Sequence, residues 1–105
     1  MNKEQIDNIV LCAKAMELDF YLNSKNTIEH TVRVGNSSYC PYINDDQAFK
    51  LAKRFMLKLD IFSGTAEFPT EVHKFSLKCF SDISINYAIV ECIAKYQSEI
   101  NKNKI

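Results

Sequence analysis

Three segments of the sequence carry apolar residues at the three- and four-residue spacing of a helix that is buried along one side. This pattern limits the fold more than any other feature. Between the helical segments, apolar and polar residues alternate as they do in half-buried strands. The predicted helices cover residues 3–17, 45–59 and 85–100, and the predicted strand segments cover residues 20–22, 27–34, 38–40 and 74–79.

The order of these segments, helix, strands, helix, strands, helix, predicts the fold class. Helices with one apolar side need a sheet to cover, and strands joined by short turns favour antiparallel pairing. We therefore expect an α+β fold. It would be a layered α/β/α sandwich with three helices and a mainly antiparallel sheet of about four strands, in a single globular domain over residues 1–105.

The charge balance excludes a field of one sign over the whole molecule. Lysine and arginine number 13, aspartate and glutamate also 13, so the formal net charge is zero. Binding to nucleic acid or anionic lipid would have to use a local patch. The first residues lack the apolar stretch of a signal peptide, and the apolar runs fall far short of the roughly 20 residues that cross a bilayer. We expect a soluble, cytoplasmic protein without membrane association.

The cysteines and histidines do not have the spacing of a structural metal site. Zinc sites favour ligand pairs two to four residues apart, whereas five residues separate the closest pair here, His73 and Cys79. In a reducing cytoplasm the cysteines should remain thiols. We expect no metal ion and no cofactor. The residues weighed are Cys12, Cys40, Cys79, Cys92, His30 and His73.

No motif in the sequence assembles a catalytic site, and we expect that the protein is not an enzyme. Cys40, beside Pro41, is the best placed thiol nucleophile, but a cysteine at the end of a strand is usually structural. Asn44, Asp45 and Asp46 precede an apolar helix, where cap oxygens and negative charge are favoured, so capping outweighs an acid/base role for the two carboxylates. A glycine-rich phosphate loop is not present.

Two sets of residues are candidates for binding. Aromatic residues on a rigid scaffold supply contact area for a protein partner, although the same rings could instead cover an open edge of the core. The aromatic candidates are Tyr39, Tyr42 and Phe68, at predicted loop or turn positions. A basic helix face could contact nucleic acid, although a solvated helix face looks the same. The basic candidates are Lys50, Lys53, Arg54 and Lys58, with Lys74 and Lys78 on a strand.

Two stretches resemble a known family. Residues 39–61 read YCPYINDDQAFKLAKRFMLKLDI, and residues 82–96 read DISINYAIVECIAKY. They are similar to the phage ABA-sandwich domain proteins, which are small phage and prophage proteins; the resemblance covers most of the chain. Cys40 stands where asparagine is usual in the family. The resemblance implies a layered α/β/α fold and a phage or prophage origin, with no established activity. The matching residues are Pro41, Asp45, Ala48, Leu51, Ala52, Ala88, Ile89 and Val90.

The expected function is therefore binding. We expect an accessory protein of phage or prophage origin that binds a host or phage protein, with modulation of host defence as one conceivable version. The alternative is a nucleic-acid-binding module that uses the basic helix face. A homodimer stays open as a further arrangement, because an exposed sheet edge can pair with a second copy.

Overall fold

A computed structural model describes residues 2–26, 29–69 and 77–103 of the chain. Within these ranges it contains three helices and six strands. The helices are α1 (Lys3–Ala15), α2 (Asp45–Arg54) and α3 (Ile85–Asn103). The strands are β1 (Phe20–Asn26), β2 (Glu29–Val34), β3 (Ser37–Ser38), β4 (Lys58–Asp60), β5 (Thr65–Glu67) and β6 (Lys78–Phe80).

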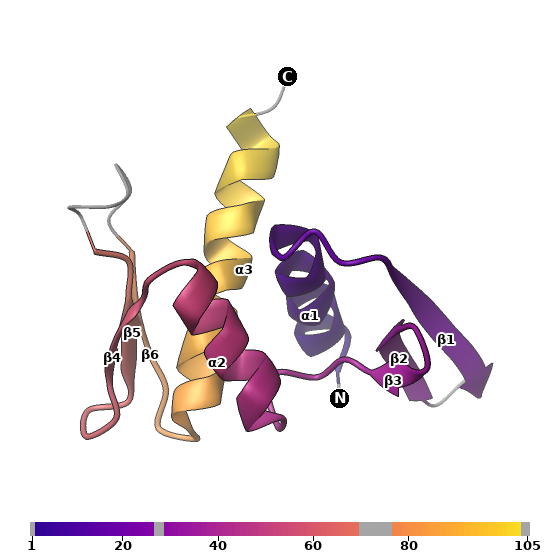
Figure 1. Ribbon diagram of the computed structural model, residues 1–105, viewed down its shortest axis with the longest axis horizontal. Helices are drawn as coiled ribbons and strands as arrows, with labels where there is room; N and C mark the ends of the chain where they lie inside the picture. Colours follow the sequence, from indigo (N-terminus) through magenta and orange to yellow (C-terminus); the bar gives the residue numbers. More distant parts are fainter. Residues whose placement is uncertain (1, 27–28, 70–76, 104–105) are drawn as a thin grey trace.

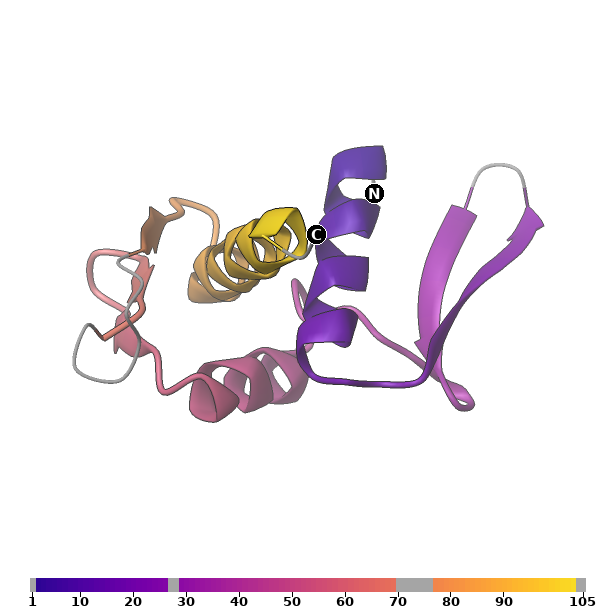
Figure 2. The ribbon, with the colours of Figure 1, turned by 90° about the horizontal axis from the view of Figure 1, so that it is seen from above.

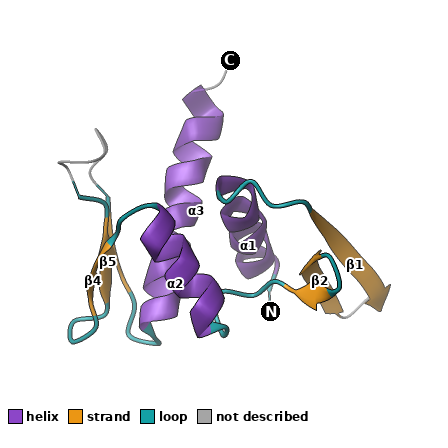
Figure 3. Cartoon of the chain, in the orientation of Figure 1, coloured by secondary structure: helices purple, strands orange, loops and turns teal. Residues whose placement is uncertain are grey.

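The strands form two separate antiparallel sheets, one with the order β1-β2-β3 and one with the order β4-β5-β6. Figure 1 shows the three helices in the middle of the molecule with one sheet at each end. The predicted α+β class is confirmed. The expected sheet of about four strands is instead two sheets of three, and the helices lie between them (Figure 3). Each sheet pairs only strands that are neighbours in sequence, and α2 lies between the two sets along the chain.

Helix α3 holds the two halves together. It packs against α1 and α2, and it also contacts β5 and β6; Figure 2 shows the elements around it from above. Ile9 of α1, Leu51 of α2 and Ile89 of α3 are fully buried, as the helical spacing of apolar residues predicts. In the second sheet, the middle register row of Leu59, Ala66 and Cys79 faces inward, because Ala66 and Cys79 are buried.

Side-chain hydrogen bonds cap the N-termini of the helices. Asn2 and Gln5 form a capping box at α1, and the Asn44 side chain accepts from the backbone N–H of Gln47 at α2. The negative charge predicted for the first turn of α2 is present in Asp45 and Asp46. At α3, the hydroxyl of Ser84 accepts from the backbone N–H of Tyr87 in the first turn, over 3.4 Å.

Helix α2 ends at Arg54, five residues before the predicted end. Met56 has a left-handed backbone with φ of 55°. The N–H of Met56 donates to the carbonyl of Lys53, and the N–H of Leu57 donates to the carbonyl of Ala52, which is the Schellman pattern of a helix C-terminus. Helix α1 ends in the same way, with Glu17 at φ 57°. Such ends are usually marked by glycine, and neither position carries one.

The strands differ from the prediction mainly in the second sheet. Residues 65–67 form β5, which the alternation pattern did not indicate, and β5 pairs with both β4 and β6. Part of the predicted strand at residues 74–79 is β6; residues 74–76 lie outside the described ranges. The predicted return strand at residues 38–40 is shorter and earlier, with Ser37 paired to Val34 and Ser38 to Arg33.

Candidate functional site

The three aromatic candidates lie in the core. Tyr39, Tyr42 and Phe68 expose only 7%, 4% and 0% of their surface. The ring of Tyr42 lies 4.5 Å from that of Tyr87, and the ring of Phe68 lies 4.7 Å from that of Tyr96. The prediction that these rings contact a partner is therefore wrong for this conformation. All three are buried residues of the core: Tyr42 and Phe68 pack against rings of helix α3, and the N–H of Tyr39 donates to the carbonyl of Val32 in β2.

The basic candidates do not form one helix face. Lys50, Lys53 and Arg54 are exposed on α2, but Lys58 lies on β4 because the helix ends early. Lys50 pairs with Asp46 at 3.0 Å, and Arg54 pairs with Glu17 at 3.3 Å. These carboxylates offset much of the positive potential that a phosphate backbone would meet. Lys78 likewise lies 3.8 Å from Glu67, and Lys74 falls outside the described residues.

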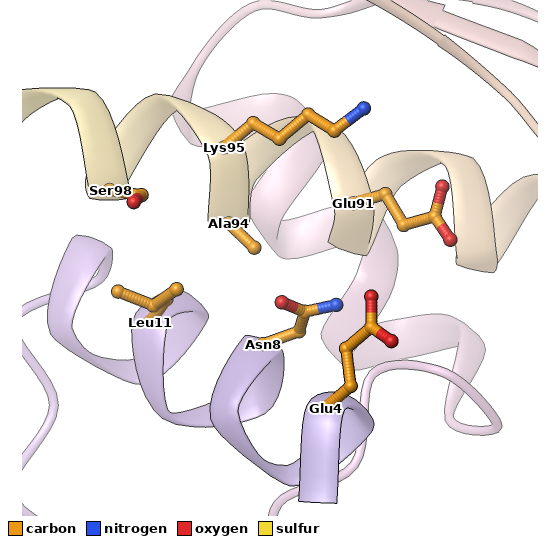
Figure 4. Close-up of a pocket in the computed structure, with 7 residues that line it drawn as sticks. All are labelled: Glu4, Asn8, Leu11, Glu91, Ala94, Lys95 and Ser98. Carbon is orange, nitrogen blue, oxygen red and sulfur yellow. The ribbon is translucent and has the colours of Figure 1, made fainter.

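A pocket of about 310 Å³ lies in the groove between α1 and α3 (Figure 4). The amide of Asn8 and the carboxylates of Glu4 and Glu91 gather at one end of it, whereas the ammonium group of Lys95 points away. The amide nitrogen of Asn8 donates to the hydroxyl of Tyr42 over 3.1 Å. Among the described residues, no three histidine, cysteine, aspartate or glutamate side chains are close enough to hold a metal ion.

The most unusual surface of the molecule is apolar. Four large side chains at one end of the second sheet are strongly exposed, and we call them the apolar cluster. They are Ile61 (72%), Phe62 (104%), Phe80 (62%) and Ile83 (68%). Ile61 and Phe62 lie in the β4–β5 turn, Phe80 is the last residue of β6, and Ile83 lies in the loop between β6 and α3. The turn and the segment from Phe80 into α3 together line a recess of about 290 Å³. Exposed apolar groups that gather in this way mark interaction sites.

The β4–β5 turn is held by its own polar groups. One carboxylate oxygen of Asp60 accepts from the backbone N–H groups of Phe62 and Ser63, at 3.1 and 3.2 Å. The N–H of Gly64 closes the turn onto the carbonyl of Asp60 at 2.8 Å. The hydrogen bonds from Ser63 lower the pKa of Asp60 from its ordinary value. Ile61 and Phe62 are thus presented on a preorganised turn.

The second loop is attached to that turn. The N–H of Ser81 donates to the carbonyl of Gly64 over 2.9 Å, and the hydroxyl of Ser81 accepts from the N–H of Ile83 over 3.1 Å. Gly64 has φ of +71°, and a Cβ there would overlap the carbonyl oxygen of Ser81. Only glycine fits this close approach. The two halves of the apolar cluster are therefore tied to each other by backbone hydrogen bonding.

The apolar cluster was not among the residues predicted from the sequence. The signal that could have found it is the pair Ile61 and Phe62, two large apolar residues placed directly before the turn residues Ser63 and Gly64. A tight turn points its middle residues into solvent. Large apolar residues at such positions are unusual.

Comparisons of the chain with protein-family models, with curated proteins and with solved structures found no match. Within the described part of the chain, no helix has the length and apolar character needed to span a membrane.

Proposed function

We propose that this protein acts by binding another protein and that the apolar cluster is the centre of its binding surface. The observation that carries the proposal is Phe62, a fully exposed ring at the apex of a turn that Asp60 holds in place. An aromatic ring left in water gains nothing from burial during folding. The same ring on a rigid turn offers contact area with little loss of conformational entropy on binding.

The charges around the cluster indicate the chemistry of the partner. Asp60, at the end of β4, and Asp82, in the loop before α3, are exposed beside the cluster, and the charge of Lys78 is close enough to Asp60 to help lower its pKa. A complementary surface would be apolar at its centre and would carry polar and charged groups at its edge. In this proposal the partner is a protein with such a surface.

The apolar cluster is large enough to form the centre of an interface. A stable interface needs roughly 800 Å² from each partner, and one large aromatic side chain supplies about 150–250 Å². Four large apolar side chains therefore supply an area of the order that an interface needs. A homodimer through this cluster is a separate outcome of the test below.

The phage setting belongs to the same proposal. The motif around Pro41 and the run Ala88, Ile89 and Val90 support membership of the small phage proteins that the chain resembles. The partner would then be a host or phage protein in the host cytoplasm, and modulation of host defence is one way in which such binding would act.

The test compares the tagged protein with two variants that each remove one exposed phenyl ring. Phe62→Ser alters the apolar cluster, and Phe49→Ser removes the ring of a 46% exposed phenylalanine on α2 as the control. Each protein is used for capture from host lysate with and without nuclease, at low and high salt. Any retained protein is then purified, and its Kd is measured directly. We expect Phe62→Ser to weaken binding at least about tenfold, as for an interface hot spot, and Phe49→Ser to bind like wild type.

Three results would contradict the proposal. A partner that binds Phe62→Ser as tightly as wild type would place the interface elsewhere. Retention of nuclease-sensitive material alone would favour the basic residues of α2. A dimer of the purified chain that Phe62→Ser dissociates, without any other bound protein, would show that the cluster serves self-association.

A further inference from the structure

The first sheet has one edge that is covered and one that is open. At the β3 edge, the side-chain amide of Gln47 donates to the carbonyl of Ser38 over 3.0 Å and accepts from the backbone N–H of Cys40 over 2.7 Å. This side chain therefore bonds to the edge as a further strand would. Strand β1 forms the other edge, on the side of β2 that faces away from α1 (Figure 2), and no strand of the described residues pairs with it there.

The strand register shows where the backbone of Leu22 points. The carbonyl of Val32 accepts from the N–H of Tyr39 over 2.8 Å, so the backbone groups of Val32 face β3. Leu22 is the partner of Val32 in the β1–β2 pair. Opposing residues of an antiparallel pair either bond to each other or both point away. The N–H and C=O of Leu22 therefore point out of the sheet at its open edge, and those of Phe20 follow the same alternation.

An apolar row of the first sheet ends at this edge without cover. Tyr39 and Val32 expose 7% and 2% of their surface, whereas Leu22, the next residue of the row, exposes 54%. Residues 20–24 read FYLNS and contain neither proline nor a charged residue, the usual protection of an edge strand. An open, apolar edge of this kind is a place where another strand can add to the sheet.

We propose that β1 pairs antiparallel with β1 of a second copy of this chain, about a two-fold axis that passes through Leu22. The N–H of each Leu22 then donates to the carbonyl of the other, because both point outward. The two leucine side chains lie side by side and continue the apolar row from Val32 of one copy to Val32 of the other. An axis through Tyr21 would pair only three residues of β1, and an axis through Asn23 would separate the two leucines.

The second copy fits this edge because the strand is its own complement. About the axis, outward backbone groups meet outward backbone groups, and one exposed leucine covers the other. The formal net charge of the chain is zero, so two copies do not repel each other. The two sheets lie at opposite ends of the molecule (Figure 1), so this pairing leaves the apolar cluster free for a partner. An interface of one strand pair is small, and we expect a Kd of about 10–100 µM.

Sedimentation equilibrium of the purified full chain, from about 5 to about 500 µM, measures the dimer. Leu22→Lys would place two ammonium groups side by side across the axis and should raise the Kd at least about tenfold. Ile43→Lys is the matched control, because Ile43 is 79% exposed in the turn before α2, and it should associate like wild type. Phe62→Ser should also dimerise like wild type, since its ring belongs to the other end of the molecule.

A cysteine placed on the axis tests the register. Leu22→Cys should form a disulfide between the two copies under mild oxidation with copper phenanthroline, because opposing Cα atoms of a hydrogen-bonded pair lie about 5.5 Å apart, within reach of a disulfide. Tyr21→Cys should not, since residue 21 lies opposite residue 23 of the second copy. Peptide mass spectrometry identifies the link, and the four native cysteines are present in both variants as a common background.

A wild-type chain that stays monomeric at every concentration would overturn the proposal. So would a dimer that Leu22→Lys leaves as tight as wild type. A dimer that Phe62→Ser dissociates would be held by the apolar cluster instead, and a stronger link in Tyr21→Cys than in Leu22→Cys would contradict the axis. If circular dichroism shows that Leu22→Lys does not fold, the wild-type sedimentation and the link in Leu22→Cys decide.

Discussion

Asp45 and Asn86 join the first turns of α2 and α3. The side-chain nitrogen of Asn86 donates to a carboxylate oxygen of Asp45 over 2.8 Å. Asn86 exposes only 6% of its surface, so its amide depends on this carboxylate for a partner. Asn44 provides the cap of α2, and Asp45 thus has a long-range role beside its favourable position at the helix N-terminus.

Replacement of Asp45 should therefore lower the free energy of unfolding more than replacement of Asp46. We expect Asp45→Ala to lower the free energy of unfolding by about 1–3 kcal/mol, because the buried amide of Asn86 loses its acceptor. Asp46→Ala removes an exposed ion pair with Lys50 and should change it by less than about 1 kcal/mol. Urea denaturation measures both. Equal effects of the two substitutions would show that the Asn86 contact does not matter.

Tyr39 and Tyr42 provide a matched pair for the role of a buried hydroxyl. The hydroxyl of Tyr39 is buried without a hydrogen-bond partner, whereas that of Tyr42 accepts from Asn8 at 3.1 Å. Tyr39→Phe should raise the free energy of unfolding by about 1 kcal/mol, and Tyr42→Phe should lower it by a similar amount. Thermal and urea denaturation of both variants give the sign of each change. A loss of stability in Tyr39→Phe would mean that its hydroxyl has a partner.

High pH should destabilise the fold through these buried tyrosines. Burial raises the pKa of Tyr42 to about 12, while in the unfolded chain the pKa of tyrosine is about 10. The unfolded state therefore loses the proton first, so the stabilising contribution is complete below pH 10 and is lost as the pH rises from about 10 to 12. Urea denaturation at pH 8, 10 and 11 should show this fall. The loss of stability at high pH should be smaller in Tyr42→Phe. An equal loss in this variant would show that other groups cause it.

Substitution of Met56 tests whether α2 ends at Arg54. It occupies a left-handed position, which a residue with a Cβ adopts at a cost, and its side chain is 59% exposed. Met56→Gly should therefore raise the free energy of unfolding by about 0.5–1 kcal/mol. Lys53→Gly, within the helix, should lower it by about 1 kcal/mol. If thermal denaturation shows that both substitutions destabilise, the helix continues past Arg54 in solution.

Substitution of Gly64 tests the close approach between the β4–β5 turn and the backbone of Ser81. Gly64→Ala would push its Cβ against the carbonyl oxygen of Ser81, while the same change at Gly35 meets no atom within 4 Å. Both residues have positive φ, so both variants carry strain. We expect Gly35→Ala to lower the free energy of unfolding by about 1 kcal/mol and Gly64→Ala to lower it by more than about 2 kcal/mol. Hydrogen exchange at Ser81 should also quicken only in Gly64→Ala; slow exchange in both would contradict the close approach.

Local features of the fold could be predicted because they depend on neighbours in the sequence. The apolar spacing around Ile9, Leu51 and Ile89 predicts three helices, and each of these residues is buried. Asn44 stands at the start of α2, where a side-chain acceptor is favoured. The end of α2 could not be predicted in the same way. Met56 takes a left-handed conformation without the glycine that usually marks one, and the hydrogen bonds of Met56 and Leu57 to the last turn accompany it.

Much less of the candidate site could be predicted from the sequence. Tyr39 and Phe62 are both aromatic residues near turns, yet one is buried and the other is fully exposed. Burial depends on which elements come to cover a side chain, and that is a property of the whole fold. The basic residues of α2 were correctly placed on an exposed surface, but the pairing of Arg54 with Glu17 joins residues far apart in the chain.

The sequence by itself determined the α+β class, the positions of the three helices and the side of each helix that is buried, because backbone hydrogen bonding and apolar periodicity act over a few residues. Only the tertiary structure decided that the helices lie between two sheets, that Asp45 meets Asn86, and that Arg54 pairs with Glu17. Those contacts join distant parts of the chain. Their formation depends on how the packed elements share one core, to which each residue contributes only a small part of the free energy.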